Sequence, residues 1–180
     1  MKKELQTKPA ELYSLFAEIL EYPTHSLYEC FEECISILLS MKSGAAKPMR
    51  DFQIHLARVP LAQMQEVYTR TFDLQPACYP YLGHHLFGED YRRGSFMAGL
   101  MKHYRSYDFS PGKELPDHIA IILRFLAQCS GSQENDELIL ECLIPALERM
   151  LSGLKNGGNP YGEVLGALLI TLQTRPQIFN

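Results

Sequence analysis

Apolar residues recur every three to four positions along nearly the whole chain, and this repeat restricts the chain to a helical fold. The first such segment places one apolar stripe at Leu12, Leu15, Phe16, Ile19 and Leu20, which is the spacing of a single helix face. The same pattern predicts further helices over residues 27–42, 48–58, 60–72, 90–104, 116–126, 133–154 and 161–174. No segment shows the alternation of apolar and polar residues that is typical of a strand. We therefore expect an all-α bundle of about seven to eight helices.

The length of the chain, 180 residues, suits one domain with a substantial buried core. Residues 43–48 contain glycine and proline but form only a short connection, so they indicate a turn between helices and not a domain boundary. Two longer irregular stretches are predicted, over residues 75–88 and 108–115. We expect residues 1–180 to form a single domain in which these two loops interrupt the helices.

The charge and the apolar pattern argue against several classes of partner. The formal net charge of −4 argues against a nucleic-acid binder, whose affinity depends on neutralising phosphates. The N-terminal segment has two lysines but no apolar stretch after them, so it does not resemble a signal peptide. No apolar run approaches the length that spans a bilayer. We expect a soluble, cytoplasmic protein with no nucleic-acid partner and no direct membrane insertion.

The cysteines are better explained by packing than by metal binding. Cys30, Cys34, Cys78, Cys129 and Cys142 form no CxxC pair. Cys30 and Cys34 lie four residues apart and share a helix face, but a metal site needs two further ligands with suitable spacing. Core packing is the favoured role, and the thiols fit a reducing compartment.

The histidines provide the alternative hypothesis, a small helical metal-binding protein or enzyme. His84 and His85 are adjacent, and His103 and His118 are possible further ligands. Adjacent histidines point in different directions, however, and no HxxxH or ExxH spacing supports a zinc site. No nucleophile and base form a known motif, and no glycine-rich phosphate loop is present, so we expect neither an enzyme nor a bound cofactor. A polar and aromatic lining for a peptide is the preferred role of this segment.

Three polar blocks lie at the joints between the predicted helices. They run from Tyr68 to Asp73, from Gly88 to Gly94 and from Glu114 to His118. In the first block, Tyr68 and Phe72 lie four residues apart, so packing in the core is their default role. In the second block, two acidic residues precede two arginines, which indicates ion pairs that hold the loop to the following helix.

The third block, from Glu114 to His118, has two interpretations. Pro116 suits the first turn of a helix, where Asp117 would complement the helix dipole and His118 would pack or cap locally. Alternatively, the carboxylate of Asp117 and the imidazole of His118 anchor a bound peptide at the mouth of a groove. Both interpretations place these residues at the start of the helix that carries Ile122 and Leu126.

In their order and spacing, the three blocks resemble the NarJ/TorD/DmsD family of chaperones that assemble molybdenum-containing oxidoreductases. The resemblance covers residues 68–126, roughly a third of the 180-residue chain, and is nearest to the nitrate reductase delta-chain branch. The block from Glu114 to His118 is similar to the family motif Glu-x-Pro-Asp-His. In the TorD/DmsD branch this region contributes to binding the leader peptide of the partner enzyme.

The resemblance implies a cytoplasmic chaperone that binds the N-terminal peptide of an apo catalytic subunit and assists cofactor insertion. The implied partner is the catalytic subunit of nitrate reductase or of a related molybdoenzyme. Residues 78–85 do not match the nitrate reductase chaperones closely, which leaves dimethyl sulfoxide or polysulfide reductases open as clients. The expected peptide-binding residues are Glu114, Pro116, Asp117, His118, Tyr81, His85, Phe87 and Tyr91.

We further hypothesise that the two irregular loops face each other across the peptide groove. Glu114 and Asp117 would then lie at the rim, where they would meet positive charges of the peptide. On this hypothesis, alanine at Asp117 or His118 would weaken peptide binding and leave thermal stability nearly unchanged.

Overall fold

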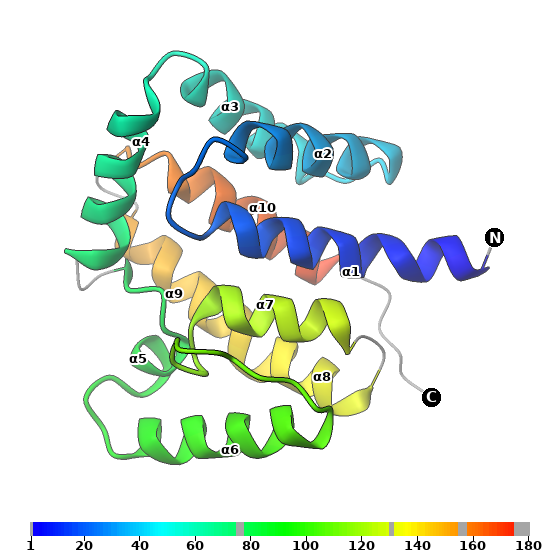
Figure 1. Ribbon diagram of the computed structural model, residues 1–180, viewed down its shortest axis with the longest axis vertical. Helices are drawn as coiled ribbons and strands as arrows, with labels where there is room; N and C mark the ends of the chain where they lie inside the picture. The colour runs from blue at the N-terminus through cyan, green and yellow to red at the C-terminus, as the bar shows by residue number, and fades with distance from the viewer. Residues whose placement is uncertain (1, 75–77, 130–131, 155–157, 175–180) are drawn as a thin grey trace.

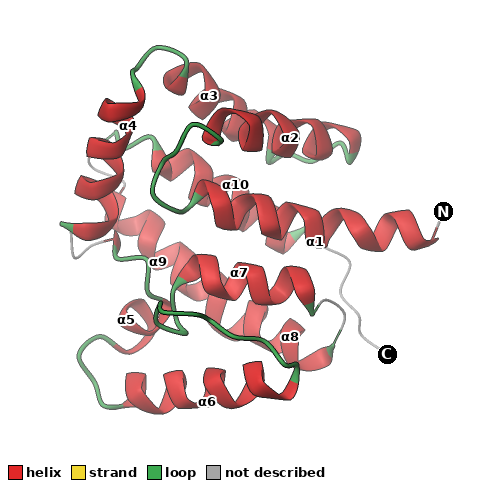
Figure 2. Ribbon diagram, in the orientation of Figure 1, coloured by secondary structure: helices red, strands yellow, loops and turns green. Residues whose placement is uncertain are grey.

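The computed structural model describes residues 2–74, 78–129, 132–154 and 158–174. Every regular element in these ranges is a helix (Figure 2), which confirms the all-α prediction. The elements are α1 (Lys2–Ile19), α2 (Leu27–Ser40), α3 (Ala46–Leu56), α4 (Leu61–Tyr68), the π-helical turn η1 (Thr69–Asp73), α5 (Leu82–Phe87), α6 (Arg92–Ser106), α7 (Ile119–Gln128), α8 (Gln133–Glu137), the π-helical turn η3 (Leu138–Leu143), α9 (Ile144–Leu154) and α10 (Tyr161–Gln173).

The helices stack in successive layers (Figure 1). In this view α2 and α3 lie at the top, α1 and α10 below them, then α7 and α9, with α6 at the bottom, while α4 crosses the ends of the layers on the left. Helix α1 packs against α7 and α2, and α10 packs against α3 and α9. The end of α1, the end of α4 and the loops before α5 and α7 therefore lie on the same side of the bundle, although they are far apart in sequence.

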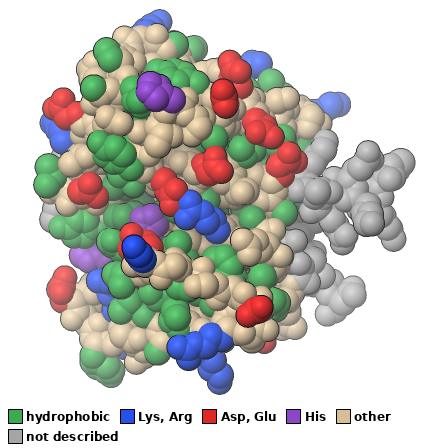
Figure 3. All heavy atoms as spheres, viewed as in Figure 1, with side chains coloured by type: hydrophobic (Ala, Val, Ile, Leu, Met, Phe, Trp, Pro, Cys, Tyr) green, Lys and Arg blue, Asp and Glu red, His purple; other side chains and the backbone are tan. Residues whose placement is uncertain are grey.

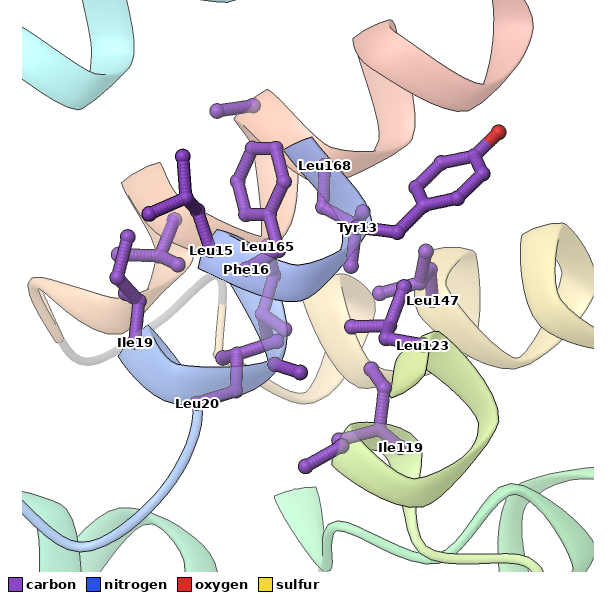
Figure 4. Close-up of a cluster of buried hydrophobic side chains, with 14 of the residues drawn as sticks. Tyr13, Leu15, Phe16, Ile19, Leu20, Ile119, Leu123, Leu147, Leu165 and Leu168 are labelled. Carbon is purple, nitrogen blue, oxygen red and sulfur yellow. The ribbon is translucent and has the colours of Figure 1, made fainter. Parts of the chain in front are cut away.

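The core forms where the apolar stripe of α1 meets α7, α9 and α10 (Figure 4). Phe16 and Ile19 of α1 are fully buried, as are Leu123 of α7, Leu147 of α9 and Leu165 of α10. Each of these side chains contributes roughly 1.5–3 kcal/mol when it is removed from water. The predicted stripe of α1 is confirmed, since all five of its residues are buried.

The eight predicted helical segments are all helical, and the differences lie in details that depend on tertiary contacts. The stretch 75–88, predicted to be irregular, contains the short helix α5. The helix predicted to start at Pro116 starts at Ile119 instead, with His118 as its N-cap. The carbonyls of Pro116 and Asp117 accept hydrogen bonds from Tyr104 and Leu82, at 2.8 Å each. These residues are therefore held by neighbouring segments and do not join the helix.

Two predicted helices contain a π-helical turn that the apolar repeat does not reveal. The helix predicted over 60–72 changes from α4 to η1 at Thr69. Within this turn the Thr71 hydroxyl donates to the Val67 carbonyl at 2.6 Å, and the Asn159 side-chain amide donates to the same hydroxyl at 2.6 Å. Inserting a polar side chain into the helical ladder in this way is a recognised cause of local irregularity.

Packing is confirmed as the environment of three cysteines, since Cys30, Cys34 and Cys78 are buried. The pKa of each of these thiols is raised to about 12, and burial is the main cause. The three thiols are therefore protonated at neutral pH, which makes them weak nucleophiles and weak metal ligands. None of the helices in the described part of the chain combines the length and apolar character needed to cross a bilayer.

Candidate functional site

The two predicted loops meet directly beside the start of α7. The Leu82 amide donates to the Asp117 carbonyl at 2.8 Å, and the Ile119 amide donates to the Pro80 carbonyl at 2.8 Å. These two bonds form an isolated antiparallel bridge between Tyr81 and His118. The loops are thus adjacent, as expected, but no groove separates them at this bridge, and this part of the groove hypothesis is wrong.

Asp117 is fully buried, which contradicts its predicted place at the rim. Its Oδ2 atom accepts hydrogen bonds from the Gly83 amide at 3.2 Å and from Arg93 Nε at 3.1 Å. The Arg93 side chain is 26% exposed, so water reaches the arginine of this ion pair but not the aspartate. Among the described atoms, Asp117 Oδ1 has no hydrogen-bond partner. Asp117 therefore joins the start of α5, the start of α6 and the loop before α7.

This arrangement requires glycine at position 83, although no sequence motif points to that residue. A Cβ atom at this position would lie 2.7 Å from Asp117 Oδ2 and 2.8 Å from Cγ of Arg93. Real Cβ contacts do not come this close, so any other residue would displace the ion pair. The interpretation of Arg93 as a structural arginine that holds the loop to its helix agrees with this contact.

His118 is also buried, and its ring caps α7. Nδ1 accepts a hydrogen bond from the Ala120 amide at 3.2 Å, which places the proton of the neutral ring on Nε2. The Tyr81 ring meets the His118 ring edge-on at 5.4 Å between centroids. Burial lowers the pKa of His118 from its ordinary value of 6.5, although the nearby Glu114 acts in the opposite direction.

This lowered pKa predicts a loss of stability in mild acid. Because the folded chain disfavours the protonated ring, the unfolded chain binds more protons as the pH falls below about 6.5. The free energy of unfolding should therefore decrease between pH 7.5 and pH 5.5 in urea titrations. His118→Asn, which retains a capping side chain, should show a smaller decrease. A decrease of the same size in both proteins would contradict this role for His118.

Tyr81, which is half-buried, and Glu114, which is exposed, form the outer edge of the bridge. The Tyr81 hydroxyl donates to Glu114 Oε1 at 3.3 Å, and the Arg93 guanidinium lies 5.5 Å from the centre of the Tyr81 ring. Burial, followed by the charge of Glu114, raises the pKa of Tyr81. Pro116 is buried behind this edge. Of the two acidic residues predicted to lie at the rim, Glu114 and Asp117, only Glu114 is exposed.

The remaining predicted residues lie along α5 and the turn that follows it. His85 Nε2 donates to the Tyr79 carbonyl at 2.7 Å, and burial lowers the pKa of His85. Phe87 packs against Phe96, with ring centroids 5.5 Å apart. Tyr91 is 85% exposed. The carbonyls at the end of α5 are bound by Arg149 of α9, which fixes this short helix to the bundle.

The four histidines of the alternative hypothesis do not form one cluster. His84 and His85 are neighbours on α5, with ring centroids 5.4 Å apart. His103, however, hydrogen-bonds to Asn135 at 3.0 Å, and His118 faces Tyr81. Within the described residues, no group of three or more histidine, cysteine, aspartate or glutamate side chains is placed to hold a metal ion.

Three further residues, Glu21, Tyr22 and Asp73, lie near the outer edge of the bridge around the buried Tyr68. None of the three was predicted to bind a partner. The pKa of the Tyr68 hydroxyl is raised, first by burial and then by the charges of Asp73 and Glu21, with smaller contributions from Tyr81 and Glu114. Tyr22 meets the Tyr68 ring edge-on at 5.6 Å between centroids. We call the resulting set the acidic tyrosine surface; it comprises Glu21, Tyr22, Asp73, Tyr81 and Glu114.

The acidic tyrosine surface also exposes apolar area. Tyr22 is 52% exposed, Leu74 beside Asp73 is 68% exposed, and Leu115 beside Glu114 is 44% exposed. On the face shown in Figure 3, acidic side chains are spread over the upper half, and acidic, basic and histidine side chains lie together left of the centre. Sequence spacing could not bring Glu21 and Tyr22 to this site, because they follow α1, more than 90 residues before Glu114.

Comparison with known proteins gives a consistent result. A family model described as nitrate reductase delta subunit matches residues 39–155. The Escherichia coli K12 protein NarJ, a nitrate reductase molybdenum cofactor assembly chaperone, is 26% identical over 159 residues, which cover 86% of this chain and 66% of NarJ. NarW of the same strain, described as a probable chaperone of the same kind, is 25% identical over 160 residues, which cover 88% of this chain and 67% of NarW.

The chain thus spans about two thirds of the length of these two relatives. A crystal structure from Archaeoglobus fulgidus, described as a candidate redox enzyme maturation protein, superposes with a TM-score of 0.62. That likeness covers 91% of this chain and 93% of the other, at 22% sequence identity. At this level of identity the structural comparison supports the fold.

Proposed function

Because this chain belongs to the nitrate reductase delta subunit family, we propose that it is an assembly chaperone for a nitrate reductase. In this proposal the chain binds the N-terminal segment of the catalytic subunit before the molybdenum cofactor is inserted. It keeps the apo subunit soluble and receptive to the cofactor, and it releases the subunit once the cofactor is in place. Cytoplasmic assembly is part of the same proposal.

The observation that carries the proposal is the acidic tyrosine surface. Its carboxylates Asp73 and Glu114 are exposed, and so is the Tyr22 ring. The exposed apolar side chains of Leu74 and Leu115 adjoin Asp73 and Glu114 in the sequence. An amphipathic, basic peptide complements this combination, since its apolar face can cover Tyr22, Leu74 and Leu115 while its cations approach the carboxylates. The helices beneath the surface form a rigid scaffold for these loop residues, as is usual for binding sites.

We assign different roles to the predicted binding residues. Glu114 would contact the peptide because it is exposed, and the half-buried Tyr81 would contact it through the hydroxyl that donates to Glu114. Pro116, Asp117 and His118 would shape the outer edge of the bridge from below, because all three are buried. His85 and Phe87 of α5 and Tyr91 in the turn before α6 would flank the surface. Of these three residues, the exposed Tyr91 is the best placed to reach a long client segment.

A binding function is favoured over the metal-binding or enzymatic alternative. The proposed histidine ligands are divided among separate contacts, as described above. The relatives are described as assembly chaperones and not as catalysts. Binding of a client segment requires no reactive group in this chain, and the buried thiols with raised pKa values agree with that.

Affinity capture from the native host tests the proposed function. The tagged chain should retain the catalytic subunit of nitrate reductase, and the retained subunit should contain less than one molybdenum per chain. The same tag on an unrelated helical protein is the control. Capture of the catalytic subunit only in its cofactor-loaded form would overturn the chaperone assignment. Capture of a dimethyl sulfoxide or polysulfide reductase subunit would instead reassign the client.

A further inference from the structure

We propose that Arg124 is an internal competitor that sets how strongly the client surface attracts positive charge, an inference that rests on the proposed function. Arg124 extends from α7 and forms an ion pair with Glu21, just beyond the end of α1, with 2.5 Å between Nη2 and Oε2. The two side chains are 34% and 42% exposed. The pair therefore lies at the surface, where a partner can reach it.

The other carboxylates of the acidic tyrosine surface differ from Glu21. Glu114 accepts hydrogen bonds from the Tyr81 hydroxyl and the Leu115 amide, but these donors carry no charge. Within the described residues, no ion pair joins Asp73 or Glu114 to a cationic side chain. One of the three carboxylates is thus neutralised by the protein itself, while the other two keep their charge available for a partner.

Arg124 and Glu21 act on the same part of the site as Glu114. Their charges influence the pKa of His118 in opposite directions, Glu21 raising it and Arg124 lowering it. A basic side chain of a client that approaches Glu21 therefore meets an arginine already bound there. Because exposed ion pairs are weak in water, such a client can displace Arg124, whereas a weakly basic peptide gains little by doing so.

This arrangement predicts that Arg124 lowers affinity for basic peptides and thereby raises selectivity. Arg124→Gln should free Glu21 and tighten binding of a basic peptide about two- to five-fold at low salt, the scale of one exposed ion pair. The gain should disappear at high ionic strength, because screening weakens exposed charges. Arg124→Lys, which keeps the positive charge, is the matched control and should change affinity less.

Two peptides separate this inference from the proposed function. One is the N-terminal peptide of the nitrate reductase catalytic subunit, and the other is a designed helical peptide of leucine and lysine. Titration calorimetry with each peptide should show tighter binding by Arg124→Gln, and a smaller gain when Glu21→Gln is already present. Thermal unfolding of each variant checks that the fold is retained.

The outcomes are distinguishable. Unchanged or weaker binding of the designed peptide by folded Arg124→Gln would overturn the role of Arg124. The same gain in the presence and absence of Glu21→Gln would overturn competition for Glu21. A gain with the designed peptide, combined with no binding of the catalytic-subunit peptide, would support the role of Arg124 while contradicting the proposed client.

Discussion

Asp117→Ala is expected to lower the free energy of unfolding by about 2–4 kcal/mol, the scale of losing charge-assisted hydrogen bonds in a buried pair. The variant removes the acceptor of the Gly83 amide and the partner of Arg93. We place the loss below that of a fully buried ion pair, because the Arg93 side chain is 26% exposed and can be rehydrated. Urea unfolding at neutral pH measures this change directly.

Glu114→Ala is the matched control for this prediction. Glu114 lies three residues before Asp117, but its side chain is exposed, so the expected change in the free energy of unfolding is within about 0.5 kcal/mol. An Asp117→Ala variant as stable as Glu114→Ala would contradict the structural role of Asp117. That result would restore the hypothesis that this carboxylate belongs to the rim of a binding site.

For Asp117, the position near a helix start could be predicted from the sequence, but its burial could not. Its position at a helix start is a local property, and the sequence places it correctly to within two residues of α7. Its burial depends on Gly83 and Arg93, which come from two other helices. No local pattern reveals such a contact, because the pairing of segments far apart in sequence is set by the packing of the whole bundle.

The long helices could be predicted because the apolar repeat that produces them is local in the sequence. Phe16 and Ile19 are buried because they share one face of α1, and the 3.6-residue repeat shows that face directly. Helix α5 was missed because it has only six residues, too few for a repeat to appear. Its end depends on Arg149 of α9, another long-range contact. Glu21 and Tyr22 were not predicted as binding residues because they too approach the site only through contacts between segments far apart in sequence.

The combined variant Asp73→Asn/Glu114→Gln is expected to weaken client-peptide binding about 5- to 30-fold at low salt, as the sum of two exposed charge interactions. Both substitutions remove a charge from the acidic tyrosine surface and keep the size of the side chain. The dependence of affinity on ionic strength should also become shallower, because fewer screened charges contribute to binding. Titration calorimetry at two salt concentrations measures both effects.

A control variant with the same change in net charge is Glu32→Gln/Glu163→Gln. These two glutamates are exposed on α2 and α10, and neither is among the groups that act on Tyr68 or His118. This control should bind the peptide nearly as tightly as the unaltered chain. Equal weakening by both double variants would show that net charge alone attracts the peptide, which would contradict a localised surface.

Titration of the unaltered chain with the N-terminal peptide of the nitrate reductase catalytic subunit tests the central claim most directly. We expect one peptide to bind per chain, with an affinity that falls as salt increases and falls strongly when the basic residues of the peptide are replaced by glutamine. Absence of binding at low salt, or equal affinity for the native and the neutralised peptide, would contradict the claim that this chain recognises its client through the acidic tyrosine surface.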